Sequence, residues 1–198
     1  MIDFKYTGIE YGYISFDAIQ EDKKVDFIFN DLDEDPLPQF INFMNHVKTD
    51  KNYQQIVINI LEEKILRLSI KDRDDNKVEF EIYEFKHGIT LKEIVNREYV
   101  VKIFEKISSD LLNDEAFPYM YPCYCRLDDD SFEIASDEID KILEKNFELN
   151  YEGQYEKEKE LLVKYMREGR IKMETGGENV FKKYKIMLTE YKIPEGWL

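Results

Sequence analysis

Residues 24–47 constrain the fold more than any other stretch, because a strand pattern there leads directly into a helix pattern. Up to Phe29 the side chains alternate as in a strand that has at least one apolar face. Across residues 37–47, apolar residues recur at helical spacing. Asp35 can cap this helix, and Pro36 suits its first turn because no backbone donor is needed there. We therefore expect a strand, an acidic connection and an amphipathic helix.

Four further segments of the N-terminal half have the character of strands. Residues 2–19 are extended in pattern, and the polar residues 21–23 would return the chain through residues 25–29 as a hairpin. After the helix, short polar connections separate three strand-like segments, which suits an antiparallel meander. These three segments are residues 55–61, 65–70 and 78–85.

A second helix is predicted over residues 90–112. Thr90 and Glu93 match the reciprocal capping box, and an apolar stripe begins directly after Thr90. The order is then β-β-α-β-β-β-α. This order predicts an α+β fold, in which two helices cover one face of a five-stranded antiparallel sheet.

The remaining residues, 113–198, predict a mainly helical extension. Ser136 is a suitable cap for one helix, and residues 155–168 form a second. Residues 180–191 favour a third helix, with a strand as the alternative. We therefore divide the chain into residues 1–112 and 113–198, and leave open whether the two parts pack as one domain.

The net charge of −15 restricts the classes of partner. Nucleic acids and anionic membranes both require clustered Lys and Arg, so we expect neither, whereas a basic protein partner is compatible. No apolar run reaches the roughly 20 residues of a membrane span, and the first residues do not resemble a signal region. We expect a cytoplasmic protein in which Cys123 and Cys125 are reduced.

The acidic clusters do not match a calcium loop. In a loop that starts at Asp31, Pro36 replaces the required Gly, and in one that starts at Asp72, Lys77 does so. Phosphate-binding glycine loops are absent as well. We therefore predict no metal and no cofactor.

Nothing in the sequence carries a signature of catalysis. His87 with Cys123 or Cys125 would supply a base and a nucleophile, but the residues are separate in sequence and lack an electropositive neighbourhood. We expect a protein that is not an enzyme. The alternative is an enzyme with a non-local site built from Cys, His and carboxylate side chains.

The aromatic tract of residues 117–125 and the three aspartates that follow it are the better candidates for function. Tyr-rich, partly rigid segments next to negative charge are typical of protein interfaces. The alternative is that the tract folds its aromatic side chains over the sheet. The residues predicted to bind a protein partner are Phe117, Tyr119, Tyr121, Tyr124, Asp128, Asp129 and Asp130, together with Asp31, Asp33 and Glu34 of the acidic connection.

Residues 33–44, DEDPLPQFINFM, and the meander after them resemble small acidic bacterial α+β proteins of the immunity or antitoxin kind. The resemblance covers just over half of the chain. It implies a protein that neutralises its partner by tight binding, commonly a basic toxin whose surface matches an acidic patch. We therefore expect an acidic cytoplasmic inhibitor of a basic protein. An oligomeric structural or adaptor protein is the further alternative, and the oligomeric state stays open.

Overall fold

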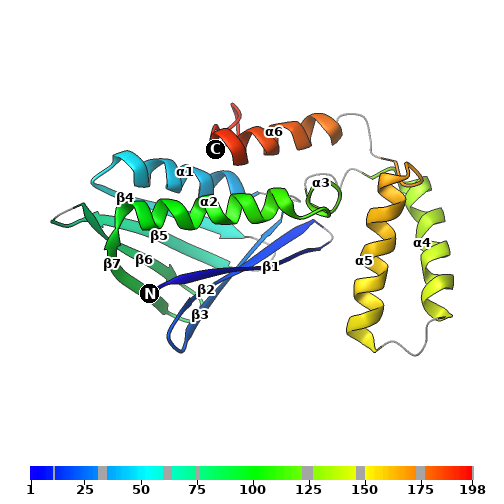
Figure 1. Cartoon of the computed structure of the whole chain (residues 1–198), viewed down its shortest axis with the longest axis horizontal. Helices are drawn as coiled ribbons and strands as arrows, with labels where there is room; N and C mark the ends of the chain where they lie inside the picture. Colours follow the sequence, from blue (N-terminus) through cyan, green and yellow to red (C-terminus); the bar gives the residue numbers. More distant parts are fainter. Residues whose placement is uncertain are drawn as a thin grey trace.

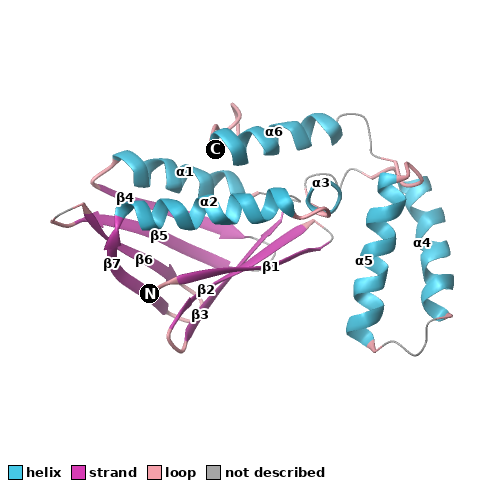
Figure 2. Ribbon diagram, viewed as in Figure 1, coloured by secondary structure: helices cyan, strands magenta, loops and turns pink. Residues whose placement is uncertain are grey.

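The computed structural model describes residues 1–10, 12–30, 35–59, 64–74, 76–121, 127–145, 150–172 and 177–197. These residues form an α+β structure of antiparallel strands, with some of the helices packed on one side of the strands and a helical hairpin beyond them (Figures 1 and 2). The strands are β1 (Asp3–Glu10), β2 (Tyr13–Gln20), β3 (Lys23–Asn30), β4 (Asn52–Asn59), β5 (Lys64–Asp72), β6 (Lys77–Glu84) and β7 (Ile89–Asn96). The helices are α1 (Leu37–Thr49), α2 (Arg97–Asn113), α3 (Phe117–Met120), α4 (Asp129–Glu144), α5 (Tyr151–Arg167) and α6 (Gly177–Glu190).

The strands form two sheets, so the prediction of one five-stranded sheet is wrong. One sheet has the order β1-β2-β3 and the other the order β4-β5-β6-β7. Residues 2–19 supply two strands and not one, because the chain reverses beside Gly12, whose φ of 87° is readily adopted by glycine. The antiparallel meander was predicted with three strands, and it gains β7 as a fourth.

The predicted helix over residues 90–112 begins too early, because its first seven residues belong to β7. Thr90 and Glu93 do not form a capping box: the Thr90 carbonyl accepts a hydrogen bond from Lys23, and a Glu93 carboxylate oxygen accepts one from the Ile2 amide. Pairing with β6 along the whole of β7 overrides the local helix signal. Helix α2 starts only at Arg97, after Asn96 in extended conformation.

The core lies between the sheets and the helices α1 and α2, and is largely aromatic. Phe40 of α1 packs on Phe104 of α2 with 4.4 Å between ring centroids, and it also contacts Phe16 and Phe27 of the three-stranded sheet. Phe43 makes the equivalent contact to the four-stranded sheet. The two helices therefore cover one face of both sheets.

The C-terminal part is mainly helical and divides into two pieces. Helix α6 packs on α1 and α2, and confirms the helical interpretation of residues 180–191. Helices α4 and α5 form a hairpin that extends away from the sheets (Figure 1). Helix α4 begins at Asp129, well before the predicted cap at Ser136. None of the helices in the described part of the chain combines the length and apolar character needed to cross a bilayer.

Candidate functional site

The first half of the aromatic tract lies inside the protein. Phe117 and Tyr121, at the two ends of α3, are 1% and 0% exposed, and their rings stack with centroids 6.0 Å apart. Both rings also contact Tyr184 of α6. Tyr119 is half-buried. The tract therefore folds two of its aromatic side chains inward, as in the alternative interpretation, although they pack against α6 rather than over a sheet.

Several predicted site residues lie outside the described residues: Tyr124, Asp31, Asp33 and Glu34, as well as Cys123 and Cys125. Their neighbour Asp35 is described, and its carboxylate joins three segments. It accepts hydrogen bonds from the Leu37 amide at 2.9 Å and from the hydroxyl groups of Tyr121 and Tyr184. The N-cap residue of α1 is Pro36 and not Asp35 as predicted, but the Asp35 carboxylate accepts from the first helical amide and ties α3 and α6 to the start of that helix.

Asp128 has a structural role at the start of α4. Its carboxylate accepts a hydrogen bond from the Ser131 amide at 2.9 Å, which makes Asp128 the N-cap of the helix. That hydrogen bond is the main reason why the pKa of Asp128 is lowered. Asp129 and Asp130 lie in the first turn and are exposed. Of the three predicted aspartates, Asp129 and Asp130 can present their carboxylates to a partner, whereas that of Asp128 is engaged in the helix cap.

Helix α4 carries an acidic outer face that continues from these aspartates. This face lies opposite the buried Ala135 and Ile139. Its residues follow one another mostly at intervals of three and four positions, which brings them to one side of the helix. We define the outer face of α4 as six of the exposed residues of the helix, Asp130, Glu133, Ile134, Asp137, Lys141 and Glu144. Four carboxylates and one lysine give it a net charge of −3, and Ile134 is 65% exposed in its middle. The helical spacing of these residues was a signal for the face that our sequence analysis missed.

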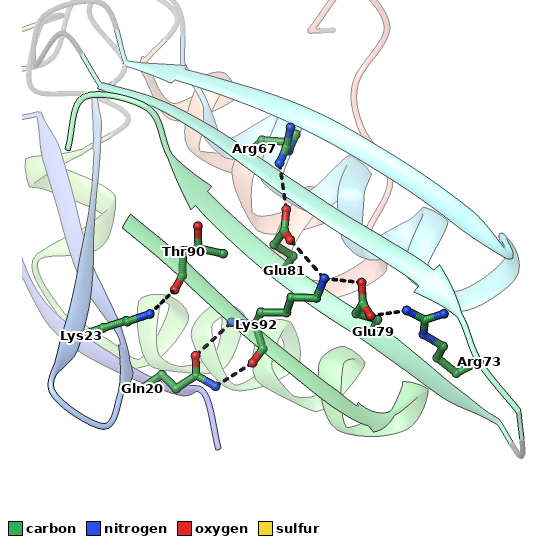
Figure 3. A network of polar contacts seen from close by, with 8 residues as sticks. All are labelled: Gln20, Lys23, Arg67, Arg73, Glu79, Glu81, Thr90 and Lys92. Atoms are coloured by element: carbon green, nitrogen blue, oxygen red, sulfur yellow. Dashed lines mark hydrogen bonds and ion pairs between the residues drawn. The ribbon is translucent and has the colours of Figure 1, made fainter. Parts of the chain in front are cut away.

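The open face of the four-stranded sheet is a second candidate surface, also missed. Its centre carries an ion network (Figure 3) in which the Lys92 ammonium lies 2.6 Å from Glu79 and 3.6 Å from Glu81. Arg67 pairs with Glu81 at 2.8 Å, and Arg73 pairs with Glu79. The hydrogen bond from Lys92, helped by Arg73, lowers the pKa of Glu79 to about 2. Glu79 is therefore ionised over the whole neutral range.

An apolar corner adjoins the network on the same face. Ile56, Ile65 and Phe85 are 38%, 40% and 45% exposed, an unusual density of exposed large apolar side chains. The ring of Tyr83 packs edge-on against Phe85, and the Arg67 guanidinium lies 5.1 Å from the Tyr83 ring centroid. Arg and aromatic residues beside aliphatic ones are the composition typical of protein-binding hot spots.

The two histidines do not assemble a catalytic site with other described residues. His46 bonds Asp50 at 2.8 Å and stacks on Tyr53, and His87 lies 3.1 Å from Glu84 with its side chain 61% exposed. Among the described residues, no group of three His, Cys, Asp or Glu side chains is placed to hold a metal. These contacts account for each histidine as part of a local surface pair.

A shallow depression lies between the edge strand β1 and α2. It has a volume of about 510 Å³ and is lined by Tyr6, Lys106, Asp110 and Asp114, among others. The Tyr6 hydroxyl donates to Asp114 at 2.7 Å, and burial together with the two carboxylates raises the pKa of Tyr6. Tyr6 and Asp114 are thus paired with each other, and Lys106 donates to the Phe4 carbonyl at 3.1 Å. Comparison of the chain with protein-family models, with curated proteins and with solved structures finds no match in any of the three.

Proposed function

We propose that the chain is a cytoplasmic protein-binding inhibitor of the immunity type, which neutralises a basic toxin or other effector by tight binding. The observation that carries the proposal is the outer face of α4, a row of exposed carboxylates on a hairpin that extends away from the sheets (Figure 1). A basic protein surface is its electrostatic complement.

The composition of this face suits recognition of such a partner. Opposite charges on two proteins steer their encounter and raise the association rate, and salt screens the effect. Ile134 offers an apolar contact in the middle of the charged row, where a partner would exclude water from it. The carboxylates therefore raise the association rate and orient the partner, and Ile134 supplies a buried contact that slows dissociation.

Charge reversal on this face tests the proposal. In the variant, Asp130, Glu133 and Asp137 are replaced by Lys, and Asp128 is left unchanged because it caps the helix. The control variant has the same change in charge at exposed carboxylates on other elements, Glu21, Asp22 and Glu195. Each protein is used as bait in an extract of the native host, and the association rate with the captured partner is measured at low and high salt.

We expect the wild type and the control to capture one stoichiometric basic protein. The α4 variant should associate at least about tenfold more slowly at low salt, with a smaller difference at high salt. Equal rates for the α4 variant and the wild type would remove α4 from the interface. The function itself would be refuted if no stoichiometric partner is captured and deletion of the chain leaves the toxin sensitivity of the host unchanged.

A further inference from the structure

The open face of the four-stranded sheet is basic, although the whole chain carries a charge of −15. The strand register places Lys71 beside Glu79, and Glu81 beside Lys92, on the same face as Arg67. With Arg73 at its margin and Lys77 at the start of β6, the face holds five cations and two carboxylates. Both carboxylates already accept from cations of the network, so the described residues of the open face carry an excess of positive charge.

The order of charges in the network argues against pairing of this face with itself. The sequence of side chains across the face is Arg67, Glu81, Lys92, Glu79 and Arg73 (Figure 3), with a cation at each end and in the middle. A two-fold axis through the centre would oppose each charge to one of the same sign. Such like-charge contacts are unfavourable. An occupant that presents carboxylates is the better complement of this face.

The outer face of α4 has the chemistry that the sheet face lacks. Its four carboxylates complement the excess cations, and Ile134, 65% exposed, complements the apolar corner of Ile56, Ile65 and Phe85. The sizes agree, because a helix of 16 residues is about 24 Å long. A strand of nine residues, such as β5, spans about 30 Å.

We infer that the open sheet face of one copy of this chain binds the outer face of α4 from a second copy, in a head-to-tail contact. The two surfaces differ, so each copy keeps one free sheet face and one free α4, and association continues beyond a dimer. This inference stands without the proposed function. Where both hold, self-association covers the surface that binds the basic partner, and the two events exclude each other.

Two variants and their mixture test the contact. The sheet-face variant carries Ile56→Glu and Lys71→Glu, which replace no member of the ion network, and the α4 variant carries Ile134→Lys and Asp137→Lys. The control variant carries Ile186→Lys and Glu190→Lys, on the exposed side of α6. The purified full chains are examined by sedimentation velocity from about 10 µM to about 1 mM, the range in which weak protein contacts form. Low and high salt are compared.

The wild type and the control should show an average mass that rises with concentration, more strongly at low salt. Each of the two interface variants should stay monomeric. Their equimolar mixture should form a dimer and nothing larger, because only one intact sheet face and one intact α4 meet in it. The inference would be overturned by a monomeric wild type over the whole range, by a mixture that stays monomeric, or by association that neither variant reduces.

Discussion

The side-chain amide of Gln20 pairs with both main-chain groups of Lys92. Its nitrogen donates to the Lys92 carbonyl at 2.8 Å, and its oxygen accepts from the Lys92 amide at 2.9 Å (Figure 3). Gln20 ends β2, and Lys92 lies in the middle of β7, the edge strand of the other sheet. One side chain thus satisfies the amide and the carbonyl of an edge-strand residue that strand pairing leaves without partners. It also links the two sheets, which remain separate.

Replacement of Gln20 by Ala should lower the free energy of unfolding by about 1 kcal/mol, since two hydrogen bonds at a water-accessible edge are lost. The Lys92 amide should also exchange its hydrogen faster. Gln20→Glu keeps the acceptor and loses the donor, so it should fall between the wild type and the Ala variant. Urea unfolding and amide hydrogen exchange measure the two effects.

Gln54→Ala is the matched control, because Gln54 is an exposed amide on the edge strand β4. It should change stability by no more than a few tenths of a kcal/mol. Unchanged exchange at Lys92 in the Gln20→Ala variant would show that the amide pair does not protect this edge.

A second connection, made by Arg97, holds the end of α1 against the four-stranded sheet. Its guanidinium donates to the carbonyls of Val47 and Asp50 at 2.5 and 2.7 Å, and to the Asp72 carboxylate at 2.9 Å, with the side chain 15% exposed. Arg97→Ala should cost about 2–3 kcal/mol, because partly buried acceptors lose a charged donor. Arg97→Lys should recover only part of this loss, since one ammonium cannot reproduce the planar fork.

Urea unfolding of both variants, with Arg73→Ala as control, checks the prediction. Among the described residues the Arg73 guanidinium pairs with Glu79, and its side chain is 38% exposed, so its loss should cost much less. If Arg97→Lys is as stable as the wild type, the geometry of the fork is irrelevant and only the charge matters. The prediction would be contradicted if the free energy of unfolding of Arg97→Ala is no lower than that of Arg73→Ala.

The elements that were predicted correctly are those whose signal is local. The apolar stripe of α1 comes from neighbouring residues, and so does the alternation of β6. The division into two sheets depends on contacts such as that of Gln20 with Lys92, 72 residues apart, which no local pattern contains. The Thr90 and Glu93 pattern misled because pairing with β6 decided the conformation of both residues.

The candidate surfaces show the same limit. The composition of residues 117–130 predicted an exposed aromatic and acidic loop, but whether an aromatic ring faces water depends on what packs on it. Tyr184, far along the chain, covers Phe117 and Tyr121. The outer face of α4 was visible as helical spacing, once its start is placed at Asp129. To predict the basic sheet face, one must know which residues pair across the strands, and the sequence alone does not give this register.

Tyr6 predicts a dependence of stability on alkaline pH. Burial, and after it the carboxylates of Asp114 and Asp110, raises the pKa of Tyr6 above its usual value of 10.0. Above about pH 10 the unfolded chain therefore releases a proton that the native protein retains, so this residue makes stability fall as the pH rises. The full contribution is present below pH 10.

Tyr6→Phe should cost about 1 kcal/mol at neutral pH, because the hydrogen bond to Asp114 is lost. Above pH 10 the alkaline loss of stability should be shallower than in the wild type, by up to about 1.4 kcal/mol for each pH unit. Urea unfolding between pH 7 and pH 11 compares the two proteins, and Tyr53, Tyr99 and Tyr191, whose pKa values are also raised, contribute equally to both.

Asp114→Asn separates the effect of the carboxylate from that of burial. The Asn amide can still accept the Tyr6 hydroxyl, but without the negative charge Tyr6 should ionise at a lower pH than in the wild type, and still above 10.0 because burial is the larger cause. Ring NMR signals of Tyr6 followed through the alkaline range measure this directly. If Tyr6 ionises at the same pH in both proteins, Asp114 does not act on it through its charge; if it ionises near 10.0 in the wild type, the residue is not buried as the structure places it.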